Sequence, residues 1–279
     1  MKPPSLAAAL ACLIATTPAL AETTLERGAY LVNTIMTCGN CHSPHGPPSA
    51  IAGKDFSGFA RFEVPGAFDV TAPNITQDKE TGIGAWSAAD IKKLLLTGVR
   101  PNGQSIAVMP TGFYGILLAS DLDAIVAYVQ TIAPVRNKVP APIYKIAIKQ
   151  DVYPGAEKPI DPALLNDSVK RGFYLAAIGH CMECHTPRPR GELDFSNIGA
   201  GGQEFPGPWG IVKSANITSS KTKGLGDWSD AQIKQAITQG VDKDGKKLTG
   251  PMGFQYYAHM TDADLDAVTA WLRTVPPKE

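Results

Sequence analysis

Cys38-Gly39-Asn40-Cys41-His42 and Cys181-Met182-Glu183-Cys184-His185 are two copies of one short motif. In both, two residues separate a pair of cysteines, and a histidine directly follows the second cysteine. Two disulfides are the interpretation that the cysteine count alone favours for an exported chain. A thioredoxin-like redox site would need a βαβ context, which the surrounding pattern does not show, and a zinc site would need further ligands close by. The histidine after each pair favours a different chemistry.

The pattern C-x-x-C-H is the attachment signature of c-type haem. In that chemistry the two thiols form thioethers with the haem vinyl groups, and the adjacent histidine becomes the proximal ligand of the iron. Two occurrences in matching surroundings therefore predict two covalently bound haem c groups. The predicted thioether residues are Cys38, Cys41, Cys181 and Cys184, and the predicted proximal ligands are His42 and His185.

A long internal repeat surrounds the two motifs. Arg27-Gly28-Ala29-Tyr30-Leu31 returns as Arg171-Gly172-Phe173-Tyr174-Leu175, shortly before each motif. Three further pairs follow in the same order: Asn74-Ile75-Thr76 with Asn216-Ile217-Thr218, Gly82 to Ser87 with Gly224 to Ser229, and Asp121 to Ala124 with Asp264 to Ala267. A period this long indicates duplication of a whole domain rather than stacking of small units.

The N-terminus, residues 1–21, has the pattern of a secretory signal peptide. Lys2 precedes an apolar run from Leu6 to Ala15 that is too short to span a bilayer. Ala19 and Ala21 form an A-x-A pattern, so we predict cleavage after Ala21 and a periplasmic mature protein. An uncleaved N-terminal anchor is the alternative.

The mature chain is predicted to contain two domains, residues 22–135 and residues 163–279. Residues 136–162 between them are rich in proline and are predicted to form an extended connector along the surface. Each domain is small for a self-sufficient apolar core, and a buried haem would supply much of the missing core.

Both halves have helical patterns, and strand patterns are weak, so the predicted fold class is all-α. The first predicted helix of each half, Leu25 to Thr37 or Val169 to Gly179, leads into the haem motif. A second helix follows the tryptophan of the repeat, and a third carries an apolar stripe near the end of each half. The predicted boundaries of the second helices are N-caps at Ser87 and Ser229 and C-terminal glycines at Gly98 and Gly240.

A haem that only transfers electrons needs a second axial ligand from a distant part of the chain, and methionine is the leading candidate. Met109 lies 12 residues before Asp121, and Met252 lies 12 residues before Asp264, so the two sulfurs occupy equivalent positions. We predict both as distal iron ligands. A buried methionine that only fills core space is the alternative for each. Met260 competes in the second half but has no methionine counterpart in the first.

On these residues the chain resembles diheme cytochromes c, and its repeats look like the domains of cytochrome c subunits of periplasmic alcohol and aldehyde dehydrogenases. The haem motifs, the Asn-Ile-Thr segments, the Gly-x-Gly-x-Trp-Ser turns and the methionine loops carry this resemblance, which covers essentially the whole mature chain. It implies two tandem cytochrome c-like domains, each enclosing one covalently bound haem. It also implies haem-pocket roles for Asn74, Trp86, Asn216 and Trp228, for which simple turn and core roles are the alternative.

The chain differs from the dehydrogenase cytochrome subunits in one respect that bears on its partner. The dehydrogenase subunits usually carry three motifs and a membrane-anchoring tail, whereas this chain has two motifs and ends at Glu279. The particular partner and permanent membrane attachment therefore stay open, and peripheral membrane association is compatible with the sequence. The 26 basic and 26 acidic residues balance, and nothing in the sequence indicates nucleic-acid binding.

The expected function is electron transfer from a periplasmic dehydrogenase to a downstream cytochrome or terminal oxidase, without enzymatic activity of its own. A peroxidase-like diheme enzyme or a haem sensor, each with one open iron site, is the alternative. The paired methionines favour the carrier, because they leave neither iron with a vacant position.

Overall fold

The computed structural model describes residues 22–46, 49–189 and 191–279. The predicted signal peptide and its cleavage site after Ala21 lie outside the described residues. Within the described ranges, no helix is long and apolar enough to cross a membrane.

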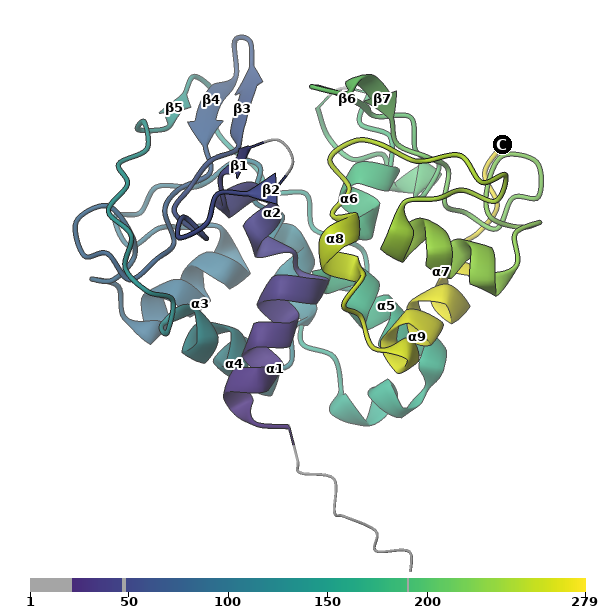
Figure 1. Ribbon diagram of the computed structural model, residues 1–279, viewed down its shortest axis with the longest axis horizontal. Coiled ribbons are helices and arrows are strands. Elements are labelled where there is room, and N and C mark those ends of the chain that lie inside the picture. Colours follow the sequence, from purple (N-terminus) through teal and green to yellow (C-terminus); the bar gives the residue numbers. More distant parts are fainter. Residues whose placement is uncertain (1–21, 47–48, 190) are drawn as a thin grey trace, which may run out of the picture.

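Two halves of similar build lie side by side, with their long helices at the centre of the molecule (Figure 1). The first half contains α1 (Thr24–Tyr30), the π-helix η1 (Leu31–Ile35), α2 (Cys38–His42), β1 (His45–Gly46), β2 (Ser49–Ala50), β3 (Arg61–Val64), β4 (Phe68–Thr71), α3 (Ala88–Thr97), the 3-10 helix η2 (Thr111–Ile116) and α4 (Ala119–Val129). The second half contains the 3-10 helix η3 (Pro162–Asn166), α5 (Ser168–Ile178), α6 (Cys181–His185), the 3-10 helix η4 (Phe195–Asn197), β6 (Glu204–Gly207), β7 (Gly210–Lys213), α7 (Asp230–Gln239), α8 (Phe254–Tyr257) and α9 (Asp262–Leu272). Strand β5 (Ile143–Tyr144) lies between the two halves in the sequence.

In each half, the first and last helices cross at a glycine. A Cβ atom on Gly28 of α1 would lie 2.0 Å from the carbonyl oxygen of Ala124 in α4. A Cβ on Gly172 of α5 would lie 1.9 Å from the carbonyl oxygen of Ala267 in α9. Backbone atoms cannot move aside as side chains do, so only glycine permits this close helix contact. The repeated glycine therefore positions the helix that leads into each haem motif.

The predicted ends of the second helices are confirmed. Ser87 and Ser229 form capping boxes, with Asp90 and Gln232 respectively. The helices end at Gly98 and Gly240, whose φ angles of 67° and 63° lie in the left-handed region that favours glycine.

The first helix of the first half differs from its counterpart by one inserted residue. Seven positions separate Tyr30 from Thr37, whereas six separate Tyr174 from His180. The first half accommodates the extra residue in η1, where the backbone N–H of Met36 donates to the carbonyl of Leu31 at 2.8 Å. A π-helical turn absorbs one residue in this way. The two halves therefore reach their haem motifs with the same geometry.

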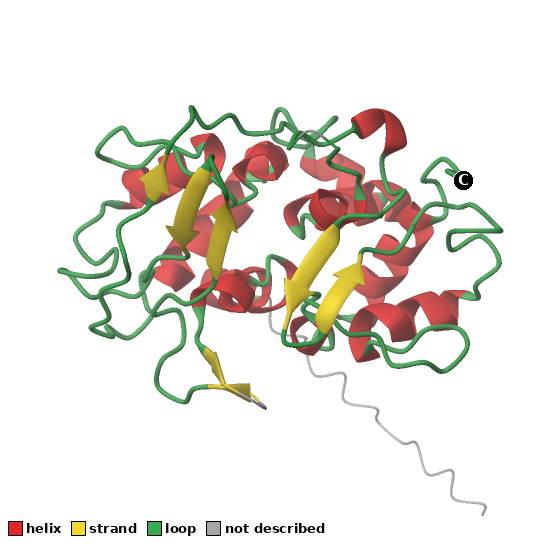
Figure 2. Cartoon of the chain, turned by 90° about the horizontal axis from the view of Figure 1, so that it is seen from above, coloured by secondary structure: helices red, strands yellow, loops and turns green. Residues whose placement is uncertain are grey.

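The structure is mostly helical but also contains small antiparallel sheets, which the all-α prediction missed. Strands β3, β4 and β5 form one sheet, β6 pairs with β7, and β1 pairs with β2. Figure 2 shows the β3–β4 and β6–β7 hairpins next to each other on the same face of the molecule. Their strands are only four residues long, and most of their residues are exposed or half-buried, so the sequence lacks a clear apolar alternation.

The proline-rich stretch 136–162 connects the halves and also packs between them. Tyr153 in this stretch is 2% exposed. Its ring stacks on Phe113 of η2, with a centroid distance of 4.8 Å, and on Phe173 of α5, at 5.6 Å. One aromatic residue of the connector thus bridges the two halves. The exact domain boundaries, 22–135 and 163–279, stay a prediction.

Two matching polar contacts join the halves directly. The Tyr30 hydroxyl donates to Asp264 and the Tyr174 hydroxyl donates to Asp121, each at 2.6 Å. Each aspartate also binds the arginine of its own half, Arg171 or Arg27. Because each contact runs from one repeat to the other, the two halves are related by an approximate twofold arrangement.

Candidate haem sites

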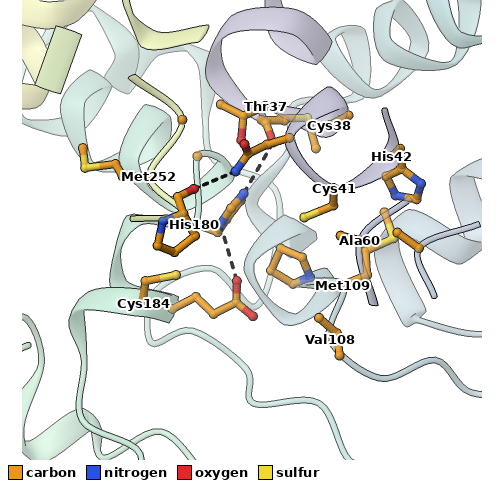
Figure 3. A pocket seen from close by; sticks show the side chains of 18 of the residues that line it. Thr37, Cys38, Cys41, His42, Ala60, Val108, Met109, His180, Cys184 and Met252 are labelled. Atoms are coloured by element: carbon orange, nitrogen blue, oxygen red, sulfur yellow. Dashed lines mark hydrogen bonds and ion pairs between the residues drawn. The ribbon is translucent and has the colours of Figure 1, made fainter. Parts of the chain in front are cut away.

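The cavity that contains both haem motifs has a volume of about 3410 Å³ and extends across both halves of the molecule. Figure 3 shows Cys41, His42 and Met109 on one side of the close-up and Cys184 and Met252 on the other. All the residues that the sequence singled out line this cavity: Cys38, Cys41, His42, Asn74, Trp86, Met109, Cys181, Cys184, His185, Asn216, Trp228 and Met252. Every predicted site residue therefore lines this one cavity.

The cysteines lie on two short helices, α2 and α6, and none of these four residues forms a disulfide. The residue before each helix, Thr37 or His180, has a positive φ, 48° or 44°, which turns the chain sharply from the long helix into the motif. Burial raises the pKa of Cys38 to about 12 and that of Cys181 to about 11. A redox C-x-x-C site has a lowered thiol pKa, whereas burial raises the pKa of these two thiols.

In each histidine of the two motifs, one ring nitrogen is hydrogen-bonded to a backbone carbonyl. Nδ1 of His42 lies 2.7 Å from the carbonyl oxygen of Pro73, and Nδ1 of His185 lies 2.7 Å from that of Ala215. A carbonyl only accepts, so Nδ1 carries the proton and Nε2 keeps its lone pair. Burial also lowers the pKa of both imidazoles, which favours the neutral form. Each histidine is therefore prepared to bind a metal through Nε2.

The two methionine loops share the backbone geometry that follows the methionine, although Val108 before Met109 has a φ of 73°, which the proline ring of Pro251 before Met252 does not allow. Pro110 has φ −79° and ψ 50°, and Gly253 has φ −80° and ψ 54°. In both loops the methionine carbonyl accepts a hydrogen bond from the backbone two residues later, at 2.8 Å for Met109 and 3.0 Å for Met252. Met260 also lines the cavity but follows α8 at a different point. The geometry therefore supports Met109 and Met252 as the equivalent pair.

The asparagines of the repeat line the cavity, but their amides bind the surrounding chain. The Asn74 amide donates to the Val135 carbonyl at 2.7 Å, and the Asn216 amide donates to the Lys278 carbonyl at 2.8 Å. These bonds hold the C-terminal end of each half against the loop that contains Pro73 or Ala215, whose carbonyl is hydrogen-bonded to the histidine. Trp86 and Trp228 are half-buried on the cavity wall. The haem-pocket roles of these four residues stay a prediction.

Sequence reasoning missed the two carbonyl groups that fix the histidines. Pro73 and Ala215 are unlike each other as residues, and only their backbone atoms take part. The available signal was positional, because each directly precedes the repeated Asn-Ile-Thr segment.

A family model for cytochrome c matches the chain twice, over residues 25–133 and over residues 169–276. The chain is also 30% identical to a diheme cytochrome c-type protein of Cereibacter sphaeroides over 264 residues, which are 88% of this chain and 85% of that protein. The chain therefore belongs to the cytochrome c family and carries two covalently bound haem c groups.

Cytochrome subunits of dehydrogenases match part of the chain. The fructose dehydrogenase cytochrome subunit of Gluconobacter japonicus is 36% identical over 107 residues, and the gluconate 2-dehydrogenase cytochrome c subunit of Pantoea cypripedii is 40% identical over 107 residues. Each match covers 38% of this chain but only 21% or 23% of the subunit. Together with the diheme relative, these similarities identify an electron-transfer cytochrome.

The residues present fit a haem in each half. Two thiols, a histidine with a free Nε2 and a methionine from a distant loop all line the same cavity. A bound haem supplies one-electron oxidation and reduction of its iron. The thiols, the histidine, the methionine and the apolar lining of each half are the groups that would attach the haem, bind its iron and set its reduction potential.

Proposed function

We propose that the protein is a periplasmic diheme electron carrier that accepts electrons from a dehydrogenase and passes them to a downstream cytochrome or terminal oxidase. The observation that carries the proposal is that the same arrangement occurs twice: the histidine of each C-x-x-C-H motif shares the cavity with a methionine at an equivalent position of its own half. Axial ligands on both faces leave an iron without a position for substrate, which is what outer-sphere electron transfer requires. Catalysis at either iron is not part of this function.

The residue roles follow the same arrangement. Cys38, Cys41, Cys181 and Cys184 form the thioethers, His42 and His185 are the proximal ligands, and Met109 and Met252 are the distal ligands. The tyrosine–aspartate contacts and Tyr153 hold the halves together, so the two haems keep a constant separation. A constant separation favours a relay in which one haem receives the electron and the other delivers it.

A dehydrogenase as donor is supported by the names of the partial relatives, which are cytochrome subunits of fructose and gluconate dehydrogenases. Export is supported by the pattern of residues 1–21. Export and haem attachment are tested by the intact mass of the protein isolated from a periplasmic extract. The expected mass is that of residues 22–279 plus two haems, and a mass that retains residues 1–21 contradicts cleavage.

Electron acceptance is tested with the oxidised holoprotein and a membrane fraction that contains a quinone- or flavin-dependent sugar or alcohol dehydrogenase. Substrate should reduce both haems, seen as growth of the reduced optical bands, and a matched sample without substrate should not change. Reduction that does not depend on the dehydrogenase's substrate contradicts the proposed donor class. This test leaves the diheme assignment itself untouched.

A further inference from the structure

The methionine loop of the second half lies against the haem-attachment helix of the first half, α2. The side-chain amide of Asn40, between Cys38 and Cys41, donates to the backbone carbonyl of Pro251 at 2.8 Å. Pro251 directly precedes Met252. This hydrogen bond therefore links the attachment site of one haem to the distal-ligand loop of the other.

Two further contacts flank this hydrogen bond. A Cβ on Gly39 would lie 2.9 Å from the Tyr256 hydroxyl, so a side chain there would require the Tyr256 ring to shift. Gly253 faces Thr37, with the Thr37 Cγ2 atom 3.5 Å from where a Gly253 Cβ would lie. Thr37 is 4% exposed. Figure 3 shows Thr37 in the same close-up as Met252. Residues 37–40 thus pack against residues 251–256, and they contact that loop both before and after Met252 in the sequence.

The reverse contact differs. Glu183 occupies the place of Asn40 in the second motif, and Oε2 of its carboxylate lies 3.4 Å from Nδ1 of His180 in the same half. An ionised carboxylate has no proton to donate to a carbonyl. The loop of Met109 is held instead by the connector, because the backbone N–H of Tyr153 donates to the Gly112 carbonyl at 3.0 Å. The two distal loops therefore have different supports.

We propose that Asn40 is a positioning residue for the second haem: through Pro251 it holds the Met252 loop in the position from which the sulfur binds iron. This inference rests on the proposed distal role of Met252. With this role for Asn40, the strength of Met252 ligation depends on a residue of the first haem motif. Met109 ligation does not depend in the same way on Glu183, the corresponding residue of the second motif. Attachment of the first haem would then stiffen the support of the second haem's ligand.

The test measures competition by imidazole for the distal position of the ferric holoprotein. Loss of one hydrogen bond that favours the closed loop should weaken Met252 ligation, so Asn40→Ala should bind imidazole at the second haem roughly five-fold more tightly than the unchanged protein. Imidazole affinity at the first haem should not change. Imidazole that displaces a methionine sulfur removes the methyl resonance of that ligated methionine from the ferric protein's NMR spectrum, which distinguishes the haems, and Met252→His identifies the Met252 resonance.

Asn40→Asp is the second variant, because aspartate has nearly the same shape but, when ionised, no donor for the carbonyl. It should weaken Met252 ligation at least as much as alanine, and it carries the test if Asn40→Ala does not mature with two haems. Asn102→Ala is the matched control, since Asn102 is an exposed asparagine in a turn of the first half and accepts a hydrogen bond from the backbone N–H of nearby Gln104. Its imidazole affinities should equal those of the unchanged protein.

Equal imidazole affinities in the Asn40 variants and the unchanged protein, or an equal change at both haems, would overturn the positioning role and leave the function intact. Absence of a Met252 resonance in the unchanged protein would overturn the distal-ligand assignment, and this inference with it. The two failures are therefore distinguishable.

Discussion

The hydroxyl of Tyr30 lies 2.6 Å from Oδ2 of Asp264, although the two residues are 234 positions apart and belong to opposite halves. The same hydroxyl accepts a hydrogen bond from the backbone N–H of Thr261, the N-cap of α9. Burial and the hydrogen bond to Asp264 raise the pKa of Tyr30 to about 12, so the phenol remains a donor at neutral pH. The first helix of one half thus fixes the start of the last helix of the other.

Removing this hydroxyl should destabilise the protein. Tyr30→Phe and Tyr174→Phe each take a donor from an aspartate whose side chain is 2% or 6% exposed. A hydrogen bond to a charged group contributes about 2 kcal/mol, and we expect a loss of that size in the free energy of unfolding for each variant. Denaturant unfolding of the holoprotein measures it. Tyr144→Phe is the control, because its hydroxyl bonds to Ala107 at 3.3 Å, away from the contact between α1 and α9. Equal losses in all three variants would argue against a special role for the contact.

The two glycines at which the first and last helices of each half cross should not tolerate replacement by a residue with a side chain. Gly28→Ala and Gly172→Ala each place a methyl group about 2 Å from a backbone carbonyl oxygen. The helices must separate, so we expect a loss of about 3 kcal/mol or more in the free energy of unfolding. Thermal unfolding of the holoprotein checks this. Gly103→Ala serves for comparison, since a Cβ there meets no atom within 4 Å and only its φ of 84° opposes the change. A comparable loss there would contradict the steric explanation.

The two capping boxes predict different responses to acid. Ser87→Ala and Ser229→Ala should each cost about 1 kcal/mol of stability at neutral pH. Hydrogen bonds from Ser87 lower the pKa of Asp90 below its ordinary 3.8. Asp90's contribution is therefore complete above the ordinary aspartate pKa and is lost as the pH falls through the lowered one. The effect of Ser87→Ala should shrink in that acidic range. Gln232 does not ionise, so the effect of Ser229→Ala should stay constant, and a parallel decline in both would refute this explanation.

The distal ligands should control the reduction potentials one at a time. Met109→His and Met252→His each exchange a thioether for an imidazole, and methionine ligation raises the potential relative to two histidines. We therefore expect one haem's midpoint potential to fall in each variant while the other haem's stays close to its original value. Potentiometric titration followed optically resolves the two. Met260→Leu is the control and should leave both potentials unchanged; a fall in that variant would make Met260 the second distal ligand.

Local signals in the sequence predicted local structure well. The haem motifs, the Ser87 and Ser229 caps and the glycine C-caps depend on residues a few positions apart, and their geometry follows from those residues alone. The hairpins were missed because four-residue strands with exposed side chains have no apolar alternation. The burial of Tyr153 was also missed, since a proline-rich stretch has the composition of a solvent-exposed linker.

The contacts between the halves could not be predicted, because they join residues far apart in the sequence. Tyr30 with Asp264 and Asn40 with Pro251 depend on how the two repeats pack, which no local pattern specifies. One signal was present nevertheless. Arg27, Tyr30 and Asp121 all recur in the second half although they lie outside the haem motif. In a duplicated chain, polar residues repeated without an obvious role are candidates for the contact between the copies.

A methionine on each iron closes both haems to other ligands, and the optical spectrum of the purified holoprotein is the measurement that tests this arrangement. We expect a weak near-infrared sulfur-to-iron band from both ferric haems and no carbon monoxide binding after reduction. The opposite result is a haem that lacks this band and binds carbon monoxide. It would show that Met109 or Met252 is not a firm ligand and that one iron is open to a substrate or a signal.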